Sequence, residues 1–561
     1  MTEPRAFFAV DLGTATTSVA LVVRFGGRWR LLGALAFPSG VEPDQIIGLL
    51  VSRIARADPP LAAELGLARW PDRDPGPDAA LDLAVSPRQA LGSAADWPRI
   101  TSRSVPPRTL AVLAASEKRR AQLETAASGS GWRVSSASLE RSDPLAIMTL
   151  VLDATVSGVL LGSGTPAGPE ERRGVRMLAD LVVAVVERRP ELAVMLIGGA
   201  AEHVPALGAA RREAGKAGAL LAMPEGVGTD GADQRLRTTM SRLVADPDDT
   251  RLGIVRSTSS LAAVLDRRIE TLEVGLTAGL RAIVGRRPGH PAGPLDERSA
   301  IVPEAGFVSD EPDTPQLDGI QAWSTVAIDR PRLRDRLREL WLAPWAEAYG
   351  DGAALRLTAA RGALGRLLAA TPGFNDLPAP DLVLVAGGPW AVAPPAAIAL
   401  AVLDLLRRPG VTQLAYDHAR LLGPIGTIEN EDERQALLAE LAEDLLAPLA
   451  TAVVPQGLHA GRAVGRLVLH AGATPVTREL VGGHVELIEL PPGMTRTAEL
   501  EFRDGVVLGG RGRRFALEVG GGLGGLLVDL RDVPLHLPEA DDRRREVLSS
   551  WQRAAWTELG T

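Results

Sequence analysis

The chain has 561 residues, of which 46% are hydrophobic and 23% are charged, so it is long enough for a large core and for three or four domains. Its formal net charge of −8 gives no electrostatic footprint for nucleic acid and argues against DNA and RNA as ligands. The absence of cysteine excludes disulfides, thiolate metal sites and cysteine nucleophiles.

Short patterns remove two further classes of protein. The only Gly-Lys pair, Gly215-Lys216, is followed by alanine and stands at the wrong spacing from Gly208, so a P-loop nucleotide site is excluded. The N-terminus lacks the order of a signal peptide, and the apolar stretches end well short of the roughly 20 residues that a membrane span needs. We therefore expect a soluble, cytoplasmic protein with no membrane partner.

The first predicted element is a β-hairpin. Apolar runs rich in β-branched residues, Phe7–Val10 and Ser18–Val23, flank a turn rich in glycine and threonine, and Asp11 ends the first run. Backbone N–H groups and hydroxyls in such a turn can hold phosphate oxygens, while a carboxylate at the strand end can hold a hydrated Mg²⁺. The alternative is a plain hairpin with an aspartate-capped turn and solvent-facing threonines.

Alternating helices and strands are expected next along the chain. Turn-forming residues over 57–107 predict an irregular insertion. Helical spacing over Glu170–Arg189 precedes a short apolar run that ends in Gly198-Gly199, and the same order returns over Ala353–Ala370 before Gly387-Gly388. The alternation predicts an α/β fold, and the recurrence suggests an internal duplication. A pair of glycines after a strand is more often a structural turn than a ligand site.

The sequence changes in character after an amphipathic helix predicted over Glu433–Leu449. Runs of period two, separated by Gly and Pro turns, predict a small β domain over 451–540. A polar helix within 541–561 is expected to close the chain.

Two stretches resemble motifs of the actin, Hsp70 and sugar-kinase superfamily. "VDLGTATTSVALV" (10–22) is similar to its first phosphate loop, and "LVLVAGG" (382–388) to its adenosine motif. The resemblance implies duplicated actin-like (ribonuclease H-like) α/β halves, 1–200 and 201–450, ahead of the β domain. It also implies ATP or ADP as cofactor, with Mg²⁺ held through water by Asp11, the one candidate catalytic residue. The implied nucleotide contacts are Gly13, Thr14, Thr16 and Thr17 for phosphate, and Gly387 and Gly388 for adenosine.

Further stretches narrow the resemblance to the MutL/GlmL family. They are "LIGGAAEH", "VAGGPW", "GVTQLAYDHARLLGPIGTI", "VVPQGLHAGR", "GGLGGLLVDLRDVPLHLP" and "RRREVLSSW". Members of that family have an actin-like ATPase domain, are encoded beside adenosylcobalamin-dependent glutamate mutase, and have a proposed role as chaperone or reactivase of that enzyme. The resemblance therefore implies a nucleotide-binding accessory protein whose client is a cobalamin-dependent mutase. Within it, 417–428 falls where the superfamily places a second contact between its halves.

The second phosphate loop of the family is the feature that this sequence lacks. The segment expected to carry it has Arg256 in place of the aspartate and Thr258 in place of the glycine, but keeps hydroxyls at Thr258, Ser259 and Ser260 as candidate phosphate contacts. A turn at Asp153 is a second candidate. Because phosphoryl transfer depends mostly on positioning, loss of the second aspartate predicts a weak or degenerate ATPase, with Arg256 contacting a phosphate instead.

Two other functions are compatible with the same fold. A scaffold of the FtsA/PilM type would be supported by an amphipathic C-terminal membrane helix, and residues 539–560 lack the apolar face of such a helix. A small-molecule kinase of the superfamily would need a catalytic aspartate in a substrate cleft, and the sequence identifies none.

Overall fold

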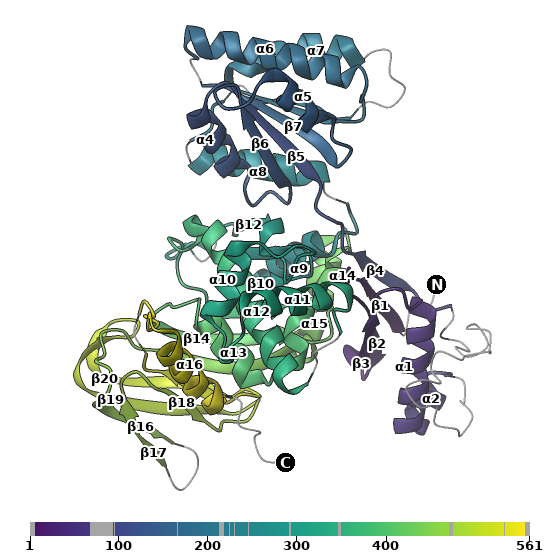
Figure 1. The fold of residues 1–561 in the computed structure, drawn as a ribbon. Coiled ribbons are helices and arrows are strands. Elements are labelled where there is room, and N and C mark those ends of the chain that lie inside the picture. Colours follow the sequence, from purple (N-terminus) through teal and green to yellow (C-terminus); the bar gives the residue numbers. More distant parts are fainter. Residues whose placement is uncertain are drawn as a thin grey trace. The chain divides into compact units, whose positions relative to one another are not determined.

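The computed structural model describes residues 6–67, 94, 96–164, 167–211, 218–223, 225–228, 230–244, 246–290, 293–345, 349–470, 475–531 and 533–555. The chain divides into two compact units (Figure 1). Unit 1 comprises Met1–Val105, Pro247–Ser299 and Ala305–Thr561, and unit 2 comprises Pro106–Asp246 with Ala300–Glu304. The boundary expected at residue 200 falls inside unit 2.

The first sheet of unit 1 contains the predicted hairpin. Its strands are β1 (Ala6–Leu12), β2 (Thr16–Phe25), β3 (Arg28–Pro38) and β4 (Arg99–Arg103), in the order β3-β2-β1-β4. β2 is antiparallel to β1, and β4 is parallel to it. Helices α1 (Pro43–Ala57) and α2 (Pro59–Glu64) follow β3, and α1 contributes Ile47 and Leu50 to the core around Phe8. The expected irregular segment 57–107 thus contains α2 near its start and β4 near its end, and its central part lies outside the described residues.

A second sheet of unit 1 has the order β12-β11-β10-β13-β14-β15-β21-β18. These strands are β10 (Ile269–Val274), β11 (Gly279–Gly285), β12 (Asp296–Val302), β13 (Leu382–Ala386), β14 (Gly410–Asp417), β15 (Leu446–Val454), β18 (Val485–Ile488) and β21 (Leu526–Asp529). Helices α9 (Thr250–Leu265), α10 (Thr314–Ala322), α11 (Arg330–Leu342), α12 (Gly350–Ala370) and α13 (Pro395–Leu403) belong to the same unit.

The two sheets repeat one arrangement. β10 and β11 form an antiparallel hairpin with β13 parallel to β10, as β1 and β2 do with β4, and the orders β3-β2-β1-β4 and β12-β11-β10-β13 correspond strand by strand. The predicted fold class, a duplicated actin-like α/β core, is confirmed in this repeat. The repeat expected from the two glycine pairs is a different one and is wrong, because the strand before Gly198 belongs to the separate sheet of unit 2.

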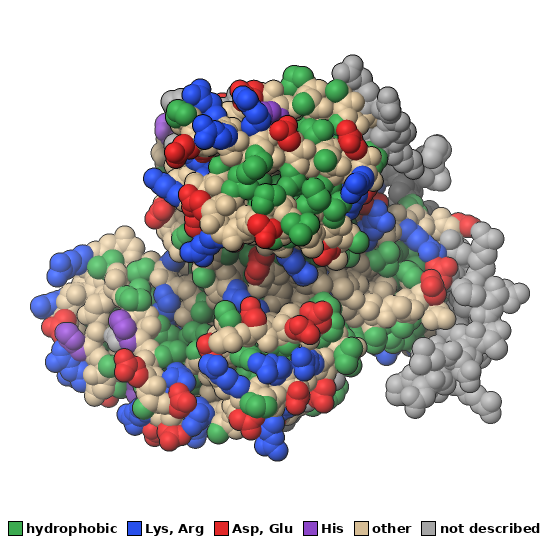
Figure 2. Space-filling model, turned by 45° about the horizontal axis from the view of Figure 1, so that its top comes forward, with side chains coloured by type: hydrophobic (Ala, Val, Ile, Leu, Met, Phe, Trp, Pro, Cys, Tyr) green, Lys and Arg blue, Asp and Glu red, His purple; other side chains and the backbone are tan. Residues whose placement is uncertain are grey.

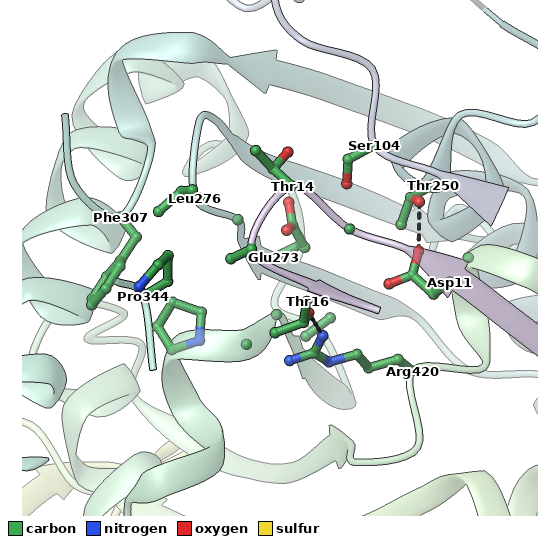
Figure 3. Close-up of a pocket in the computed structure, with 18 of the residues that line it drawn as sticks. Asp11, Thr14, Thr16, Ser104, Thr250, Glu273, Leu276, Phe307, Pro344 and Arg420 are labelled. Carbon is green, nitrogen blue, oxygen red and sulfur yellow. Dashed lines mark hydrogen bonds between the residues drawn. The ribbon is translucent and has the colours of Figure 1, made fainter. Parts of the chain in front are cut away.

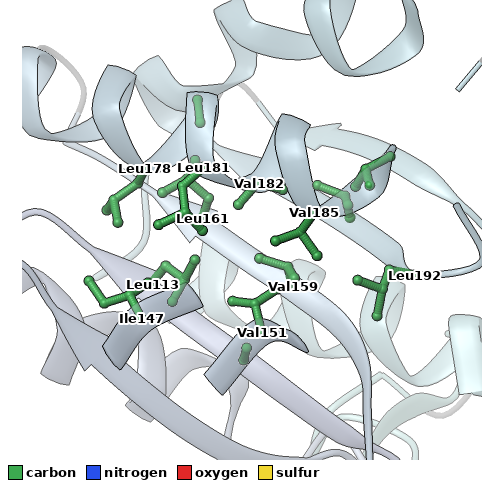
Figure 4. Packing of buried hydrophobic residues seen from close by; sticks show 14 of the residues in the cluster. Leu113, Ile147, Val151, Val159, Leu161, Leu178, Leu181, Val182, Val185 and Leu192 are labelled. Carbon is green, nitrogen blue, oxygen red and sulfur yellow. The ribbon is translucent and has the colours of Figure 1, made fainter. Parts of the chain in front are cut away.

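Unit 2 has a parallel sheet of order β6-β5-β7-β8-β9. The strands are β5 (Thr109–Ala114), β6 (Arg133–Ser138), β7 (Val156–Gly162), β8 (Ala193–Ile197) and β9 (Leu220–Met223), and the helices are α4 (Glu117–Ala127), α5 (Pro144–Leu152), α6 (Pro169–Val186), α7 (Val204–Arg211) and α8 (Asp230–Val244). Leu113 and Leu161 pack against Val182 of α6 on one face, as Figure 4 shows, while Leu160 packs with α4 and α8 on the other. Helices on both faces explain why β5, β7 and β8 are largely apolar.

The C-terminal part of unit 1 adds an antiparallel sheet, as the sequence predicts. Its order is β17-β16-β19-β20, with β16 (Ala463–Leu469), β17 (Val476–Val481), β19 (Thr495–Val507) and β20 (Arg511–Gly520). Helix α15 (Glu431–Leu445) ends earlier than predicted because β15 begins at Leu446, and α16 (Asp541–Ala555) follows the sheet. Within the described residues, no helix combines the length and apolar composition that a bilayer crossing requires.

A buried ionic network fixes this C-terminal part to the α/β core of unit 1. Arg531 pairs with both oxygens of Asp529, at 2.8 and 2.7 Å, and with Asp404 at 2.6 Å. Arg361 of α12 pairs with the other oxygen of Asp404 at 2.9 Å. All four side chains are buried. On the surface, by contrast, acidic and basic side chains are interspersed over the face shown in Figure 2.

Candidate functional site

A pocket in unit 1 opens where the repeated strands end (Figure 3). It encloses about 810 Å³, open solvent at its mouth included. Its walls come from the β1–β2 turn, the β10–β11 turn, the residues after β13 and the loop after β14. The larger apolar residues of the lining include Ile254, Leu276, Phe307, Pro344 and Trp345. A concave, mostly preformed site with a few convergent polar groups is the usual form of a small-molecule site.

Asp11 lies in the wall of this pocket, near the end of β1, and is only 6% exposed. Its Oδ1 accepts hydrogen bonds from Ser102 Oγ of β4 at 2.9 Å and from Thr250 Oγ1 of α9 at 2.7 Å. Burial raises the pKa of Asp11, and the positive charge of Arg420 and the two hydroxyls oppose that rise. The carboxylate is therefore oriented by two elements that are distant in sequence.

The turn after Asp11 is tight, and its backbone lines the pocket. Gly13, Thr14 and Thr16 line the pocket, whereas Thr17 is buried in the hairpin, where it pairs with Leu12, and lies outside the lining. A Cβ on Gly13 would lie 2.7 Å from the carbonyl oxygen of Thr16, so the turn has room for no side chain there.

The β10–β11 turn has the same construction. In the first hairpin the last paired residues are Leu12 and Thr17, which leaves 13–16 in the turn. In the second they are Val274 and Gly279, which leaves 275–278. Glu273 thus corresponds to Asp11, and Gly275 to Gly13; all four residues line the pocket. The second strand–carboxylate–glycine turn exists, with glutamate as its acid.

The segment that the sequence analysis gave as the second phosphate loop, residues 256–260, has a different structure. Residues 256–260 form no turn between strands but lie inside α9, which is capped by Asp249 at its N-terminus. Thr258 bonds to Thr271, Ser259 donates to Glu297, and Ser260 accepts from Arg434 Nε at 2.8 Å. None of these three hydroxyls lines the pocket. They bind other parts of the fold, which is why a buried helix contains so many polar residues.

The second candidate turn is also separate from the pocket. Asp153 precedes β7 in unit 2, where its Oδ1 accepts hydrogen bonds from the backbone N–H and the hydroxyl of Thr155, both at 2.7 Å. This is a local turn at the surface of the sheet.

Glu273 is a buried acid of the pocket with an oxygen that accepts no hydrogen bond from the described residues. It is 8% exposed, and its Oε2 has no hydrogen-bond partner among the described residues. Arg251 Nε lies 3.9 Å from that oxygen. Burial raises the pKa of Glu273 to about 7, with Arg251 opposing the rise and the negative charge of Asp11 adding to it. A buried acceptor without a partner, in the wall of a pocket, fits a ligand or a hydrated cation.

A third carboxylate, Asp417, ends β14. It accepts hydrogen bonds from the backbone N–H groups of Leu421 at 2.9 Å and Leu422 at 3.1 Å, and so caps the short helix α14 (Leu422–Gly426). Burial raises the pKa of Asp417 to about 6, and the charge of Asp11 adds to the rise. The sequence analysis did not single out this residue, although its position at the end of an apolar strand is a signal of the same kind as Asp11.

Three arginines also line the pocket, Arg251, Arg356 and Arg420, and Arg356 donates from Nη1 to Pro344 O. Arg251 of α9 donates from Nη1 to Val105 O at 3.1 Å and from Nη2 to Thr277 Oγ1 at 3.3 Å. Arg420 donates from Nη1 to Thr16 Oγ1 (Figure 3). The pocket thus combines three carboxylates with three guanidinium groups. Across the described part of the chain, no cluster of three or more His, Cys, Asp or Glu residues is arranged to hold a metal ion directly.

The glycine pair after β13, Gly387-Gly388, lies in the wall of the pocket. Gly387 has a φ of 106°, and a Cβ there would lie 2.1 Å from Val274 O at the end of β10. A Cβ on Gly388 would lie 2.7 Å from Nη2 of Arg420. Position 387 therefore needs glycine for its conformation and its backbone contact, whereas a Cβ at position 388 would meet only the movable end of the Arg420 side chain.

Helices α9 and α14 touch backbone to backbone beside the pocket. A Cβ on Gly426 would lie 1.8 Å from Gly253 O, and one on Gly253 would lie 2.2 Å from Gly423 O. Ser257 Oγ donates to Leu422 O at 2.7 Å across the same contact. This contact occurs in the segment 417–428 that the resemblance marks for joining the two halves.

Comparison with known proteins places the fold in context. No family model and no curated protein sequence matches the chain. The nucleotide-free structure of acetone carboxylase is similar over 84% of this chain and 80% of its own, at 12% identity and a TM-score of 0.26. The PilM-PilN type IV pilus biogenesis complex is similar over 78% and 98%, at 12% identity and 0.22. A Ppx/GppA phosphatase of Aquifex aeolicus is similar over 77% and 88%, at 8% identity and 0.18. At these TM-scores the similarities carry no functional argument.

Proposed function

We propose that this chain is a nucleotide-binding protein of the actin-like type, with ATP or ADP as the ligand of the unit 1 pocket. One observation carries the proposal: two matched strand–carboxylate–glycine turns, at Asp11 and at Glu273, face the same pocket. Such turns present backbone N–H groups to phosphate oxygens, and the guanidinium groups of Arg251 and Arg420 supply positive charge. The adenosine would lie against Gly387-Gly388.

The residues of this pocket could hold a hydrated Mg²⁺ ion through its water ligands. Asp11 uses one carboxylate oxygen for both of its hydrogen bonds, and Glu273 has an unpartnered buried oxygen, so both acids can accept from waters of a hydrated cation. The metal would neutralise phosphate charge that these acids otherwise repel. Because an acid stands in both turns, the reason given above for a degenerate ATPase no longer holds. We propose slow hydrolysis, since the side chain of Glu273 is longer than that of aspartate and would position its carboxylate differently.

Calorimetric titration with ATP and ADP, with Mg²⁺ and with EDTA, tests the proposal together with a turnover assay. We expect micromolar binding that Mg²⁺ strengthens, and we expect Asp11→Asn to remove the strengthening. Asp153→Asn is the matched control, because it makes the same change in a surface turn of unit 2. Absence of binding under every condition would refute the proposal. Rapid phosphorylation of a metabolite would identify a kinase instead.

The resemblance to the MutL/GlmL family supports a finer proposal about the partner. The nucleotide state of this chain would control its affinity for a protein client, a cobalamin-dependent mutase, which it would reactivate as a chaperone. Domain closure around a ligand is a common way to couple the two. The test is recovery of activity by an inactivated mutase of this type on addition of the chain and ATP. Equal recovery with Asp11→Asn would contradict the coupling.

A further inference from the structure

Arg420 lies between the two parts of the pocket assigned to the nucleotide. Its guanidinium donates to Thr16 in the first glycine turn and occupies the space above Gly388 after β13 (Figure 3). One side chain therefore spans from the proposed phosphate site to the proposed adenosine site.

The backbone holds Arg420 in this place. Its φ is 54°, a left-handed conformation that residues other than glycine rarely adopt. The loop is fixed on either side, because Asp417 ends β14 and accepts the N–H groups of Leu421 and Leu422. Unusual backbone conformations of this kind collect at functional sites.

The guanidinium of Arg420 has no anionic partner among the described residues. Burial raises the pKa of Asp11, Glu273 and Asp417, and the positive charge of Arg420 opposes that rise in all three, so the guanidinium interacts electrostatically with each acid. Nevertheless the guanidinium of Arg420 donates only to the neutral hydroxyl of Thr16, and it forms no ion pair with any residue that the structure describes. A planar guanidinium without an anionic partner is the group that best matches two phosphate oxygens at once.

We propose that Arg420 recognises the polyphosphate of the nucleotide, and that its contact with Thr16 is exchanged for paired hydrogen bonds to phosphate oxygens when the ligand enters. This inference rests on the proposed nucleotide function and deepens it. A nucleoside without phosphate offers no phosphate oxygen to replace Thr16 as the partner of Arg420. The polyphosphate therefore contributes more to the affinity than the base does. Part of the binding therefore needs no metal.

The test compares ADP, adenosine and inorganic tripolyphosphate on the full chain by calorimetry, with Mg²⁺ and with EDTA. Arg420→Asn removes the charge and keeps a residue that tolerates left-handed φ, while Arg420→Lys keeps the charge without the planar fork. We expect Arg420→Asn to weaken ADP and tripolyphosphate at least tenfold in both conditions and adenosine less than twofold. Arg420→Lys should fall between. Arg513→Gln, an exposed arginine of β20, is the matched control.

Two results would overturn the inference while leaving nucleotide binding intact. One is ADP affinity unchanged in Arg420→Asn, and the other is equal weakening of ADP and adenosine, which would mean a structural role. If the wild-type chain binds tripolyphosphate through Arg420 but neither ADP nor ATP, phosphate recognition stands and the nucleotide function fails. If it binds none of these ligands, both fail.

Discussion

Glu273 occupies at the end of β10 the position that Asp11 occupies at the end of β1, and the two carboxylates face one pocket. The duplicated fold therefore supplies a pair of acids from residues that are 262 positions apart in sequence, as 273 − 11 gives. Ser102 and Thr250 donate to the carboxylate of Asp11, whereas Oε2 of Glu273 has no hydrogen-bond partner among the described residues, so the pair is unequal before any ligand binds.

The raised pKa of Glu273 predicts how stability depends on pH. Its pKa is about 7 in the folded chain against 4.5 ordinarily, because burial outweighs Arg251. The folded state therefore binds the extra proton, and this stabilising contribution is complete below about pH 4.5 and lost as pH rises through about 7. Asp417, raised to about 6, acts with the same sign at lower pH.

We expect Glu273→Gln, which mimics the protonated acid, to flatten this loss between about pH 6 and pH 8, where one group contributes at most about 1.4 kcal/mol per pH unit. Calorimetric melting at the two pH values measures it. The matched control is Glu443→Gln, whose side chain is 87% exposed. An unchanged pH dependence in Glu273→Gln would contradict the assignment.

Gly387→Ala should damage the pocket more than its backbone conformation alone explains. The substitution would place a Cβ 2.1 Å from Val274 O, in addition to the strain of φ 106°. Gly410→Ala is the control, because Gly410 also has a positive φ, of 138°, but has nothing within 4 Å of a Cβ. We expect the control to lose about 1–2 kcal/mol and Gly387→Ala clearly more. Equal unfolding midpoints in urea would show that the strand ends can separate at no cost.

Gly426→Ala tests the backbone contact between α9 and α14. Since the new Cβ would lie 1.8 Å from Gly253 O, the helices must move apart, and we expect a loss of about 1–3 kcal/mol together with weaker nucleotide binding. Gly48→Ala in α1 provides the contrast, because it has no atom within 4 Å of a Cβ and should gain about 0.5–1 kcal/mol from helix propensity. Thermal unfolding of the two variants should shift in opposite directions.

Asp404→Ala is expected to be among the most destabilising changes in unit 1. It would leave the buried guanidinium of Arg361 without its ionic partner and remove one of the two acids paired with Arg531, and breaking a buried pair costs about 3–5 kcal/mol. Arg466→Ala breaks an ion pair with Glu501 whose side chains are 66% and 33% exposed, and it should cost no more than about 1 kcal/mol. Similar urea midpoints for the two variants would argue against a structural role of the network.

Sequence patterns predicted the parts of the site that are local. The hairpin around Asp11 and the strand before Gly387 each show a continuous run of β-forming residues and a glycine turn, and both lie where expected. The second turn was missed because the search required aspartate, although "IETLEVGLTAGLRAIVG" (269–285) has the same succession of strand, acid, glycine and strand. Allowing either acid would have found Glu273.

Other features could not be read from local patterns. The buried hydroxyls of α9 made a helix look like a polar turn, since their partners Thr271 and Arg434 are supplied by distant elements. Unit 2 has an α/β pattern much like that of unit 1, so nothing local marks it as a separate sheet. Arg420 enters the pocket only because the loop after β14 turns back toward the first hairpin.

The hydrogen bonds of Asp11 have one more consequence, which concerns the inserted unit. Ser102 lies three residues before Val105, where the chain leaves unit 1, and Thr250 lies three residues after Pro247, where it returns (105 − 102 and 250 − 247). The same oxygen of Asp11 thus accepts hydrogen bonds from the segment that leads into the insertion and from the segment that leads out of it. A ligand that breaks these two hydrogen bonds of Asp11 would remove a link between the segments that lead into and out of the inserted unit. The insertion comprises about 140 residues, and none of those that the structure describes lines the pocket.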